Sequence, residues 1–349
     1  MIVIGIDPHK ATHTACAVSA HTGELVAELT VSADRDGHDR LLRWARGHGR
    51  VLLFALEDCR HVSANLERLL LARGEEVVRV PPHIAAGVRK RGRRRGKSDG
   101  VDALAVARAA LQEPDLPRAR LAGIERQVRL LVDHREDLVA ERRRHQLRLR
   151  WHLHELEAPA RIPPSGLNRP KWATQLTDWL AGRQGLQARL ARELLERIGA
   201  LTADIAALDR ELAGLVTPLA GPLLAIPGCG SLTAAKLIGE IGDVARFASA
   251  AKLAMHAGVA PIQASSGIRH RHRLNRHGNR QINAALHRIA VNQGRWNPPT
   301  RDYLARREAG GDSRKEAVRA LKRHLANVVF RAMRSMAATD LGVSSVATP

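Results

Sequence analysis

The first 115 residues alternate between short apolar runs and longer amphipathic stretches. Three apolar runs come first, and the turn HTG between the second and the third indicates an antiparallel meander. Helical and strand periods then alternate up to a closing helix from about Asp99 to Gln112. The expected elements before it are strands in MIVIGID, HTACAVSA and ELVAELTVS, a helix near 34–48, a strand in VLLFALE, a helix in VSANLERLLLARG that stops at Gly74, and a strand in EEVVRV before Pro81 and Pro82.

The order of these elements is itself informative. Three strands are followed by helix, strand, helix, strand and helix, which is the order of the ribonuclease H fold. We therefore predict that residues 1–115 form an α/β domain with that architecture.

Apolar residues at heptad spacing dominate residues 116–215 and predict a helical coiled coil. The stretch RIPPSGLNRPK breaks the helix between two heptad runs. Two antiparallel helices of one chain satisfy this pattern, and so does one coiled-coil arm per subunit of a dimer. The first run contains Leu121, Ile124, Val128, Leu131, Leu138, Leu149 and Leu156, and the second contains Leu186, Leu190, Leu194, Ile198, Leu201, Ile205, Leu208, Leu212 and Leu215.

Residues 216–337 are predicted to form a mainly α domain that begins with LLAIPGCGSLTAAKLIGEIGD. An apolar helix ends there, a Pro-Gly-x-Gly turn follows, and a second helix starts at about Ser231, which is a helix-hairpin-helix pattern. Gly228 and Gly230 let the turn backbone approach a phosphate, although such hairpins also serve as plain structure. A basic helix is expected near 313–337, followed by a disordered tail over 338–349.

The length of the chain allows two or three domains, and its charge indicates that the protein binds polyanions. The net charge is +21 and the isoelectric point is about 11.3, which argues against an ordinary metabolic enzyme. Residues 216–337 contain 20 Lys and Arg against 6 Asp and Glu, and so carry most of the excess. Aromatic residues make up only 3% of the chain, so base-stacking platforms are not expected to dominate binding.

The cysteines and the apolar runs indicate the compartment. Cys16, Cys59 and Cys229 form no CxxC pair and are expected to be free thiols in a reducing environment. The N-terminus lacks the regions of a signal peptide, and no apolar run approaches the ~20 residues of a membrane helix. We therefore expect a cytoplasmic protein with no membrane partner.

Two basic groups are predicted to bind nucleic-acid phosphates. Seven of the nine residues before Ser98 are basic, and a second group lies in the run IRHRHRLNRHGNR. The alternating His and Arg of this run do not favour zinc, because the arginines would repel a cation. The predicted phosphate-binding residues are Arg89, Lys90, Arg91, Arg93, Arg94, Arg95, Lys97, Arg269, Arg271, Arg273, Arg276 and Arg280, together with Gly228 and Gly230.

Four carboxylates from three predicted elements can meet at one edge of the sheet. Asp7 ends the first strand and Glu57 ends the fourth, and these strands are neighbours in a ribonuclease H sheet. Asp99 and Asp102 lie three residues apart, on one face of the closing helix. Such a cluster repels itself unless a divalent cation lies within it, and oxygen ligands suit Mg²⁺ or Mn²⁺. The sequence therefore predicts a metal site beside a basic cluster.

Each carboxylate also has a plain structural explanation. An aspartate after a strand is often a turn residue, and Asp99 would also serve as a helix cap that the helix dipole favours. The two aspartates behind the basic cluster would also fit a solvated salt-bridge face. Asp58, next to Glu57, is predicted to point to the opposite face of the strand. The element order and the adjoining basic cluster together favour the metal site.

Several of these stretches resemble a known family. GIDPHKATH, LED and GKSDGVDALAVARA resemble the DEDD motif of the RuvC-like domain in the Piv-like insertion-sequence transposases, the one-ten family. LLAIPGCGSLTAAKLIGEIGD and FASAAKLAMHAGVAPIQASSG resemble its C-terminal transposase domain, and the motifs span about residues 2–335 in the family's order. One departure is EDCRHV, where the family often has a small residue and then Thr-Gly after the glutamate.

The resemblance implies a RuvC-like N-terminal domain in a recombinase that moves its own element. It implies DNA partners, namely the element ends and the target, and a structured bridge RNA as guide. It assigns the nucleophile to the serine directly before Gly, which is Ser266 here, with Ser265 as the fallback. In that family this serine attacks the DNA phosphate and forms a phosphoserine link, helped by the carboxylate site. From the residues alone, Ser-Ser-Gly is a flexible turn with no evident local base.

Three classes of function are therefore open. The favoured one is an RNA-guided recombinase with metal ligands Asp7, Glu57, Asp99 and Asp102, the nucleophile Ser266 and a dimeric or tetrameric assembly. The second is a RuvC-like, structure-specific nuclease in which metal-activated water cuts DNA. The third is a non-catalytic nucleic-acid binder whose acidic site is vestigial.

Overall fold

The computed structural model of the chain contains two compact units, residues 1–122 and 123–349. No helix in the described part of the chain is long and apolar enough to cross a membrane. The structure describes residues 1–58, 60–91, 98–113, 116, 118–119, 123–158, 162–163, 165–263, 272–273, 275 and 278–344.

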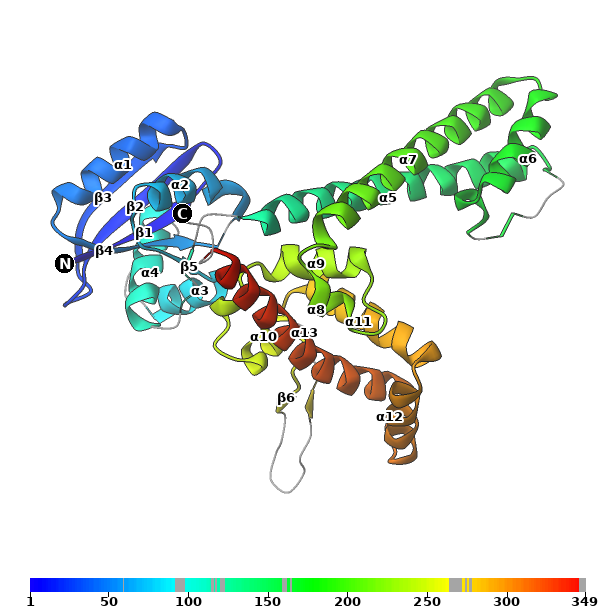
Figure 1. Cartoon of the computed structure of the whole chain (residues 1–349). Coiled ribbons are helices and arrows are strands. Elements are labelled where there is room, and N and C mark those ends of the chain that lie inside the picture. Colours follow the sequence, from blue (N-terminus) through cyan, green and yellow to red (C-terminus); the bar gives the residue numbers. More distant parts are fainter. Residues whose placement is uncertain are drawn as a thin grey trace. The chain divides into compact units, whose positions relative to one another are not determined.

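The first unit is built on a five-stranded sheet with the order β3-β2-β1-β4-β5 (Figure 1). The first three strands form the predicted antiparallel meander, and β4 and β5 run parallel to β1. This topology confirms the ribonuclease H-like fold. The strands are β1 (Ile2–Pro8), β2 (Thr12–Ser19), β3 (Leu25–Ser32), β4 (Val51–Glu57) and β5 (Val77–Val80).

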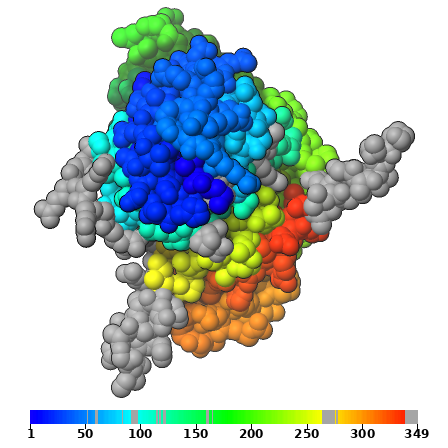
Figure 2. Space-filling view, turned by 90° about the vertical axis from the view of Figure 1, so that its left-hand side faces the viewer, coloured from blue at the N-terminus to red at the C-terminus, as the bar shows by residue number. Residues whose placement is uncertain are grey.

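Helices cover both faces of this sheet. On one face α1 (Arg35–Gly47) and α2 (Arg60–Ala72) pack on a core that includes Ile4, Ile6 and Phe54. The other face is covered by α3 (Pro82–Arg91) and α4 (Asp99–Gln112). In Figure 2 the segments from β1 to β5, dark to lighter blue, pack into one continuous body.

The sequence prediction missed α3. Its bounds begin at Pro82, and proline is favoured in the first turn of a helix because its fixed φ suits that position and it has no N–H to satisfy. In the sequence pattern, Pro81 and Pro82 indicate only the end of the preceding strand. α4, by contrast, has the predicted bounds.

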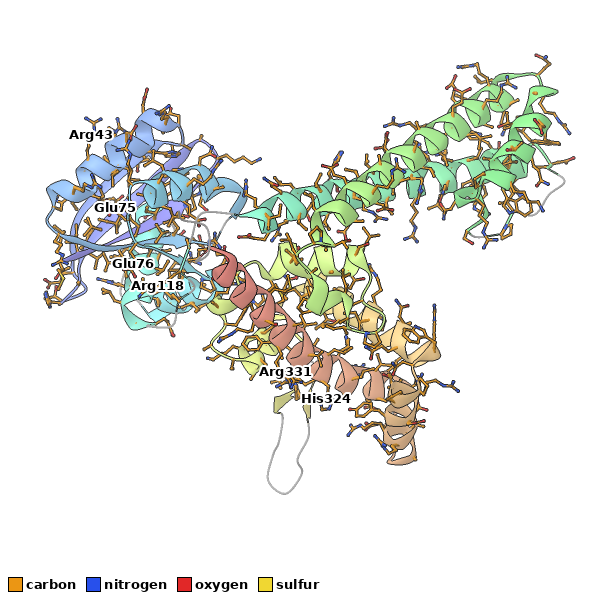
Figure 3. The ribbon with its side chains drawn as sticks, viewed as in Figure 1. Arg43, Glu75, Glu76, Arg118, His324 and Arg331 are labelled. Atoms are coloured by element: carbon orange, nitrogen blue, oxygen red, sulfur yellow. The ribbon has the colours of Figure 1, made fainter. Side chains whose placement is uncertain are left out.

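The chain after α4 returns along the edge of β5. Arg118 forms an antiparallel bridge with Val78, and the N–H of Ala119 donates to the carbonyl of Val77 at 2.8 Å. The Arg118 guanidinium lies 2.6 Å from the carboxylate of Glu76, as the labels in Figure 3 show. This segment therefore pairs part of an edge strand whose N–H and C=O groups would otherwise be open.

The second unit begins with a long antiparallel hairpin of α5 (Ile124–Glu155) and α7 (Leu186–Val216). The two helices are antiparallel, and side chains pair across them along their length. The pairs are Arg135 with Asp209, Glu141 with Arg197 and Arg142 with Thr202. The Arg197–Glu141 ion pair spans 2.7 Å. Of the two predicted arrangements, the structure forms the hairpin within one chain.

The hairpin seam follows the predicted second heptad run only in part. Ile198, Leu201, Ile205 and Leu212 are buried, as expected, but Leu186 is 64% exposed. Near the start of α7 the buried stripe instead passes through Ala188, Ala191 and Leu195. The heptad interpretation was therefore wrong at the first turns of α7, where small residues face the neighbouring helices.

Ile205→Asp should destabilise the second unit by about 3 kcal/mol or more, because it places an unpaired carboxylate at a site that is 4% exposed. Urea unfolding followed by circular dichroism measures this. Ala203→Asp on the same helix is the matched control, since Ala203 is exposed, and it should cost under ~0.5 kcal/mol. Equal costs for the two variants would show that the seam is not packed as described.

Beyond the hairpin, the unit forms a helical body around one hydrophobic core. The base of the hairpin is fixed to this body by buried charges of α9 (Ser231–Ile241). Lys236 donates to Glu136 at 2.8 Å, and Glu240 accepts from Asn279 at 2.6 Å and pairs with Arg129 at 3.5 Å. The remaining elements are η1 (Gly166–Asn168), α6 (Pro170–Ala181), α8 (Gly221–Leu224), α9 (Ser231–Ile241), η2 (Val244–Arg246), α10 (Ala250–His256), β6 (Ile262–Gln263), β7 (His272–Arg273), α11 (Arg280–Trp296), α12 (Pro298–Ala309) and α13 (Arg314–Ser344).

The predicted basic helix near 313–337 is α13, which continues to Ser344. The prediction of a disordered tail from residue 338 is therefore wrong up to Ser344, and residues 345–349 lie outside the described residues.

Candidate metal centre

Side-chain alternation places Asp7 and Glu57 on the same face of the sheet. On β1, Ile4 and Ile6 point to the α1–α2 face, so Asp7 points to the α3–α4 face. On β4, Leu56 points to the first face and Glu57 to the second. The parallel register pairs Ile6 with Leu56, which makes Asp7 and Glu57 neighbours at the strand ends.

A glycine lets the fourth helix lie directly on this face. A Cβ atom on Gly5 would be 2.3 Å from the carbonyl oxygen of Ala103 and 2.6 Å from the Cβ of Ala107. No side chain fits there, so the backbone of α4 packs against β1 two residues before Asp7. This close approach brings the first turn of α4 to the two strand carboxylates.

That first turn carries Asp99 and Asp102. The cap is Ser98, whose hydroxyl accepts from the N–H of Val101, so Asp99 is not needed as the cap. The positive end of the helix dipole favours both carboxylates. The Asp99 side chain is 58% exposed, whereas that of Asp102 is 15% exposed. Asp102 therefore faces the strand carboxylates and Asp99 lies at the rim.

The four carboxylates interact electrostatically. Burial raises the pKa of Asp7 from 3.8 to about 6; His9 opposes this, while Glu57, Asp102 and Asp99 add to it. Burial, followed by Asp102, also raises the pKa of Glu57. Burial is the larger cause in both cases, and the positive charge near these carboxylates offsets it only in part.

Two further side chains belong to this cluster, and the sequence analysis did not place them there. His9 lies between two carboxylates, with Nδ1 3.7 Å from Asp7 Oδ2 and Nε2 4.0 Å from Asp99 Oδ1. Arg89 of α3, expected among the phosphate-binding residues, donates to Asp102. The only sequence signal for His9 is its place in the turn two residues after the strand-end aspartate. The contact of Arg89 with Asp102 could not be predicted because the helix that carries Arg89, α3, was not predicted.

The residues present fit a divalent cation. The donor set is four carboxylates, which are the hard oxygen ligands that such cations prefer, and Asp7, His9 and Asp99 can each offer a ligand atom within 4.8 Å of the others. Negative charge is concentrated here, since Glu57, Asp102 and Asp99 add to the burial that raises the pKa of Asp7, and Arg89 pairs with Asp102. Asp58 interacts electrostatically with Arg79, whose guanidinium pairs with Glu67 of α2.

Asp7→Asn should stabilise the metal-free protein in a pH-dependent way. The folded-state pKa of Asp7 is raised, so the wild type loses stability as pH rises from about 4 through about 6. The variant cannot ionise and avoids this loss, which amounts to about 2–3 kcal/mol at pH 8 and fades towards pH 4. Urea unfolding in chelator at the two pH values measures it.

The control for Asp7→Asn is Asp36→Asn, an exposed first-turn aspartate of α1. Its effect should be small and similar at both pH values. If the free energy of unfolding gained by Asp7→Asn were the same at both pH values, the raised pKa of Asp7 would be contradicted.

The other predicted site residues are described only in part. Lys90 and Arg280 are described, and Arg91 and Arg273 are backbone positions of α3 and β7. The serines and the remaining predicted cations lie outside the described residues: Ser265, Ser266, Arg93, Arg94, Arg95, Lys97, Arg269, Arg271 and Arg276. Their roles stay predictions.

The glycine turn of the helix-hairpin-helix has the expected bounds, with α9 starting at Ser231. Gly228 adopts φ +79°, and its carbonyl accepts from Asn292 of α11 at 3.4 Å. The carbonyl of Pro227 accepts from Gln293 at 2.7 Å. One side of the turn is therefore fixed to α11, whereas Gly230 is exposed. Phosphate binding at this turn stays a prediction.

Comparison with known proteins gives matches over both units. A transposase family model for the DEDD proteins of IS110 matches residues 4–157, and the model described as "Transposase IS116/IS110/IS902 family" matches residues 220–305. The chain is 28% identical to the "Insertion element IS116 uncharacterized 44.8 kDa protein" of Streptomyces clavuligerus over 386 aligned residues, which is 95% of this chain and 94% of that protein.

Two further similarities are more local. The chain is 32% identical over 116 residues to the "Pilin gene-inverting protein" of Moraxella bovis, covering 32% of this chain and 36% of that protein. The solved structure "T. thermophilus RuvC in complex with Holliday junction substrate" is similar with a TM-score of 0.25 and 16% sequence identity, covering 31% of this chain and 91% of that chain.

Proposed function

Because the chain belongs to the IS116/IS110/IS902 family of DEDD transposases, we propose that it cuts and rejoins DNA at a metal site formed by Asp7, Glu57, Asp99 and Asp102. The observation that carries the proposal is the convergence of these carboxylates on one face of the sheet, within the family-matched residues 4–157. The protein is a DNA transposase, and this fold implies dependence on a divalent metal. We propose Mg²⁺ or Mn²⁺.

The chain's own residues would perform defined tasks in this site. The four carboxylates would hold the cation, which when bound supplies positive charge that polarises the scissile phosphate. Gly5 and Ser98 set the position of α4, and so they set the distance from Asp102 to the strand carboxylates. Arg89 would be released from Asp102 as a cation binds, and would then be available to a DNA phosphate, as the sequence analysis predicted.

We propose Ser266 as the nucleophile. Attack by its hydroxyl oxygen on phosphorus would form one phosphate ester bond to the protein and break one P–O bond of the DNA strand. The number of ester bonds is unchanged, so rejoining by reversal needs no external energy source. Hydrolysis by water would lose that bond. The support for Ser266 is the resemblance in the family's C-terminal motif, within the match to residues 220–305.

We further propose that a structured RNA guides the enzyme to its DNA, in a homodimer or homotetramer. The excess of cations in residues 216–337 supports binding to a polyanion such as RNA or DNA. The test is to purify the chain under native conditions and to sequence the RNA that accompanies it. One discrete species complementary to target DNA supports guidance, whereas random cellular fragments would contradict it.

Binding to DNA and RNA should weaken steeply with salt. Each phosphate neutralised by Lys or Arg contributes a slope of about −0.9 in log K against log salt for duplex DNA and about −0.7 for single strands. Fluorescence anisotropy from low to moderate salt measures the slope. A flat affinity would show that the charge of +21 serves another purpose.

A further inference from the structure

A cavity of about 430 Å³ lies in the second unit. Residues 258–261, directly before β6, line one side, together with Asn275, which follows β7. The other sides are formed by residues of α12, α13 and the loop between them: Tyr303, Arg307, Asp312, Glu316, Arg319, Ala320, Lys322, Arg323 and His324. Figure 3 labels His324 on α13, beside β6.

Hydrogen bonds and close backbone packing hold the walls of the cavity in place. The carbonyls of Ala257 and Gly258 accept from Asn283 Nδ2 at 3.0 and 3.2 Å, and Asn283 Oδ1 accepts from Lys322 at 2.8 Å. Gly278 adopts φ +108°, and a Cβ there would be 2.7 Å from the nitrogen of Gly258. The two ends of the β6–β7 segment are thus held together and tied to α11 and α13.

Positive charge exceeds negative charge on its walls. Arg319, Lys322 and Arg323 share one face of α13, and in the described part of the chain no ion pair joins them to a carboxylate. The two acidic residues of the wall have partners on the same wall or next to it, and Glu316 also interacts electrostatically with Arg319. Asp312 pairs with Arg307, and Glu316 accepts from the backbone N–H of Ser313 at 2.9 Å and from its hydroxyl.

Lys322 is the innermost of these cations, half-buried and held by Asn283. Burial lowers its pKa, and Arg319 and Arg280 lower it further. An anion in the cavity would relieve this repulsion. The cavity is also lined by two aromatic rings, Tyr303 of α12 and His324 of α13, which meet edge to face at 5.6 Å.

Cations on one wall and an aromatic ring on another are the two features by which proteins hold a nucleotide of a single strand. We propose that this cavity binds one nucleotide of a single-stranded nucleic acid, with its phosphate on Arg319, Lys322 and Arg323 and its base against Tyr303. The site goes beyond the proposed function, because its occupancy requires neither strand cleavage nor a guide RNA. Its place at the ends of the β6–β7 segment would position a strand next to that segment.

Tyr303 is the only tyrosine of the chain, which gives a site-specific test. The full chain, freed of nucleic acid by a high-salt wash, is titrated with one short oligonucleotide made as DNA and as RNA. Anisotropy measures binding, and nitrotyrosine formation with tetranitromethane measures access to Tyr303. Bound strand should suppress nitration. Protection by DNA, by RNA or by both identifies the strand, whereas unchanged nitration at saturating binding would overturn the proposal.

Two charge-matched variants of α13 complete the experiment. Arg319→Gln with Arg323→Gln should raise the strand concentration for half-protection about tenfold, since two charge-assisted contacts together contribute roughly 1.4 kcal/mol. Arg331→Gln with Arg334→Gln removes the same charge from exposed positions outside the cavity and should raise it less than about twofold. Equal shifts would show attraction by overall charge, and would reject the cavity as the site.

Discussion

Asp102→Ala should abolish DNA strand cleavage, by at least about a thousandfold, while leaving the fold intact. The side chain is 15% exposed and faces Asp7 and Glu57, so it is a central member of the proposed ligand set. Metal-assisted charge stabilisation is worth several kcal/mol, and each 1.36 kcal/mol is tenfold in rate. Two effects on stability oppose each other: repulsion among carboxylates is relieved, and the pairing with Arg89 is lost.

Cleavage of a labelled element end, with and without chelator, measures this effect. Asp36→Ala is the matched control, because Asp36 is also a first-turn aspartate of the same unit but is exposed on α1. It should cleave at the wild-type rate. If Asp102→Ala recombined nearly as well as the wild type, the metal-site assignment would be lost. Chelator-resistant cleavage by the wild type would argue against any metal role.

Ser266→Ala should bind RNA and DNA normally and yet form no covalent protein–DNA adduct and no recombinant product. The physical reason is that no other group in the proposal conserves the energy of the broken DNA bond. Denaturing gels of labelled DNA after incubation with the protein detect the adduct directly. Binding measured on the same samples separates chemistry from affinity.

Ser265→Ala is the neighbouring control and should be much milder. If Ser266→Ala still cleaves at the wild-type rate, the protein is a nuclease that uses water, which is the second class predicted from sequence. If Ser265→Ala and not Ser266→Ala loses the adduct, the nucleophile is displaced by one residue. The carboxylate site would stand in either case, since Asp102→Ala tests it separately.

The sheet and its carboxylates could be predicted because their causes are local. A period of two along β1 and β4 fixes which face Asp7 and Glu57 share, and the three-residue spacing fixes that of Asp99 and Asp102. The close approach of α4 at Gly5 could not be predicted, because it depends on which residues of α4 meet that glycine. The same holds for Arg89, whose partner is thirteen residues away on another helix.

Heptad spacing predicted the length of the coiled coil but not its partner. A stripe such as Ile198, Leu201 and Ile205 is equally satisfied by a helix of the same chain or of another chain. The structure adds polar pairs across the hairpin of one chain, such as Arg197 with Glu141. Such pairs can be identified only when the register of α5 against α7 is known. Self-association through another surface stays a prediction.

The two ends of the α5–α7 hairpin pack in separate hydrophobic cores. On α5 the fully buried residues are Val128 and Val132 near the base, and Leu149 and Leu153 near the tip. The first pair belongs to the core of the helical body, and the second belongs to a separate small core that α6 and the start of α7 complete. Between them the middle of α5 is mostly charged, and the buried apolar residues there, such as Leu201 and Ile205, come from α7. The tip is therefore expected to open as its own cooperative unit, so its amides would exchange with solvent deuterium while those of α9 remain protected.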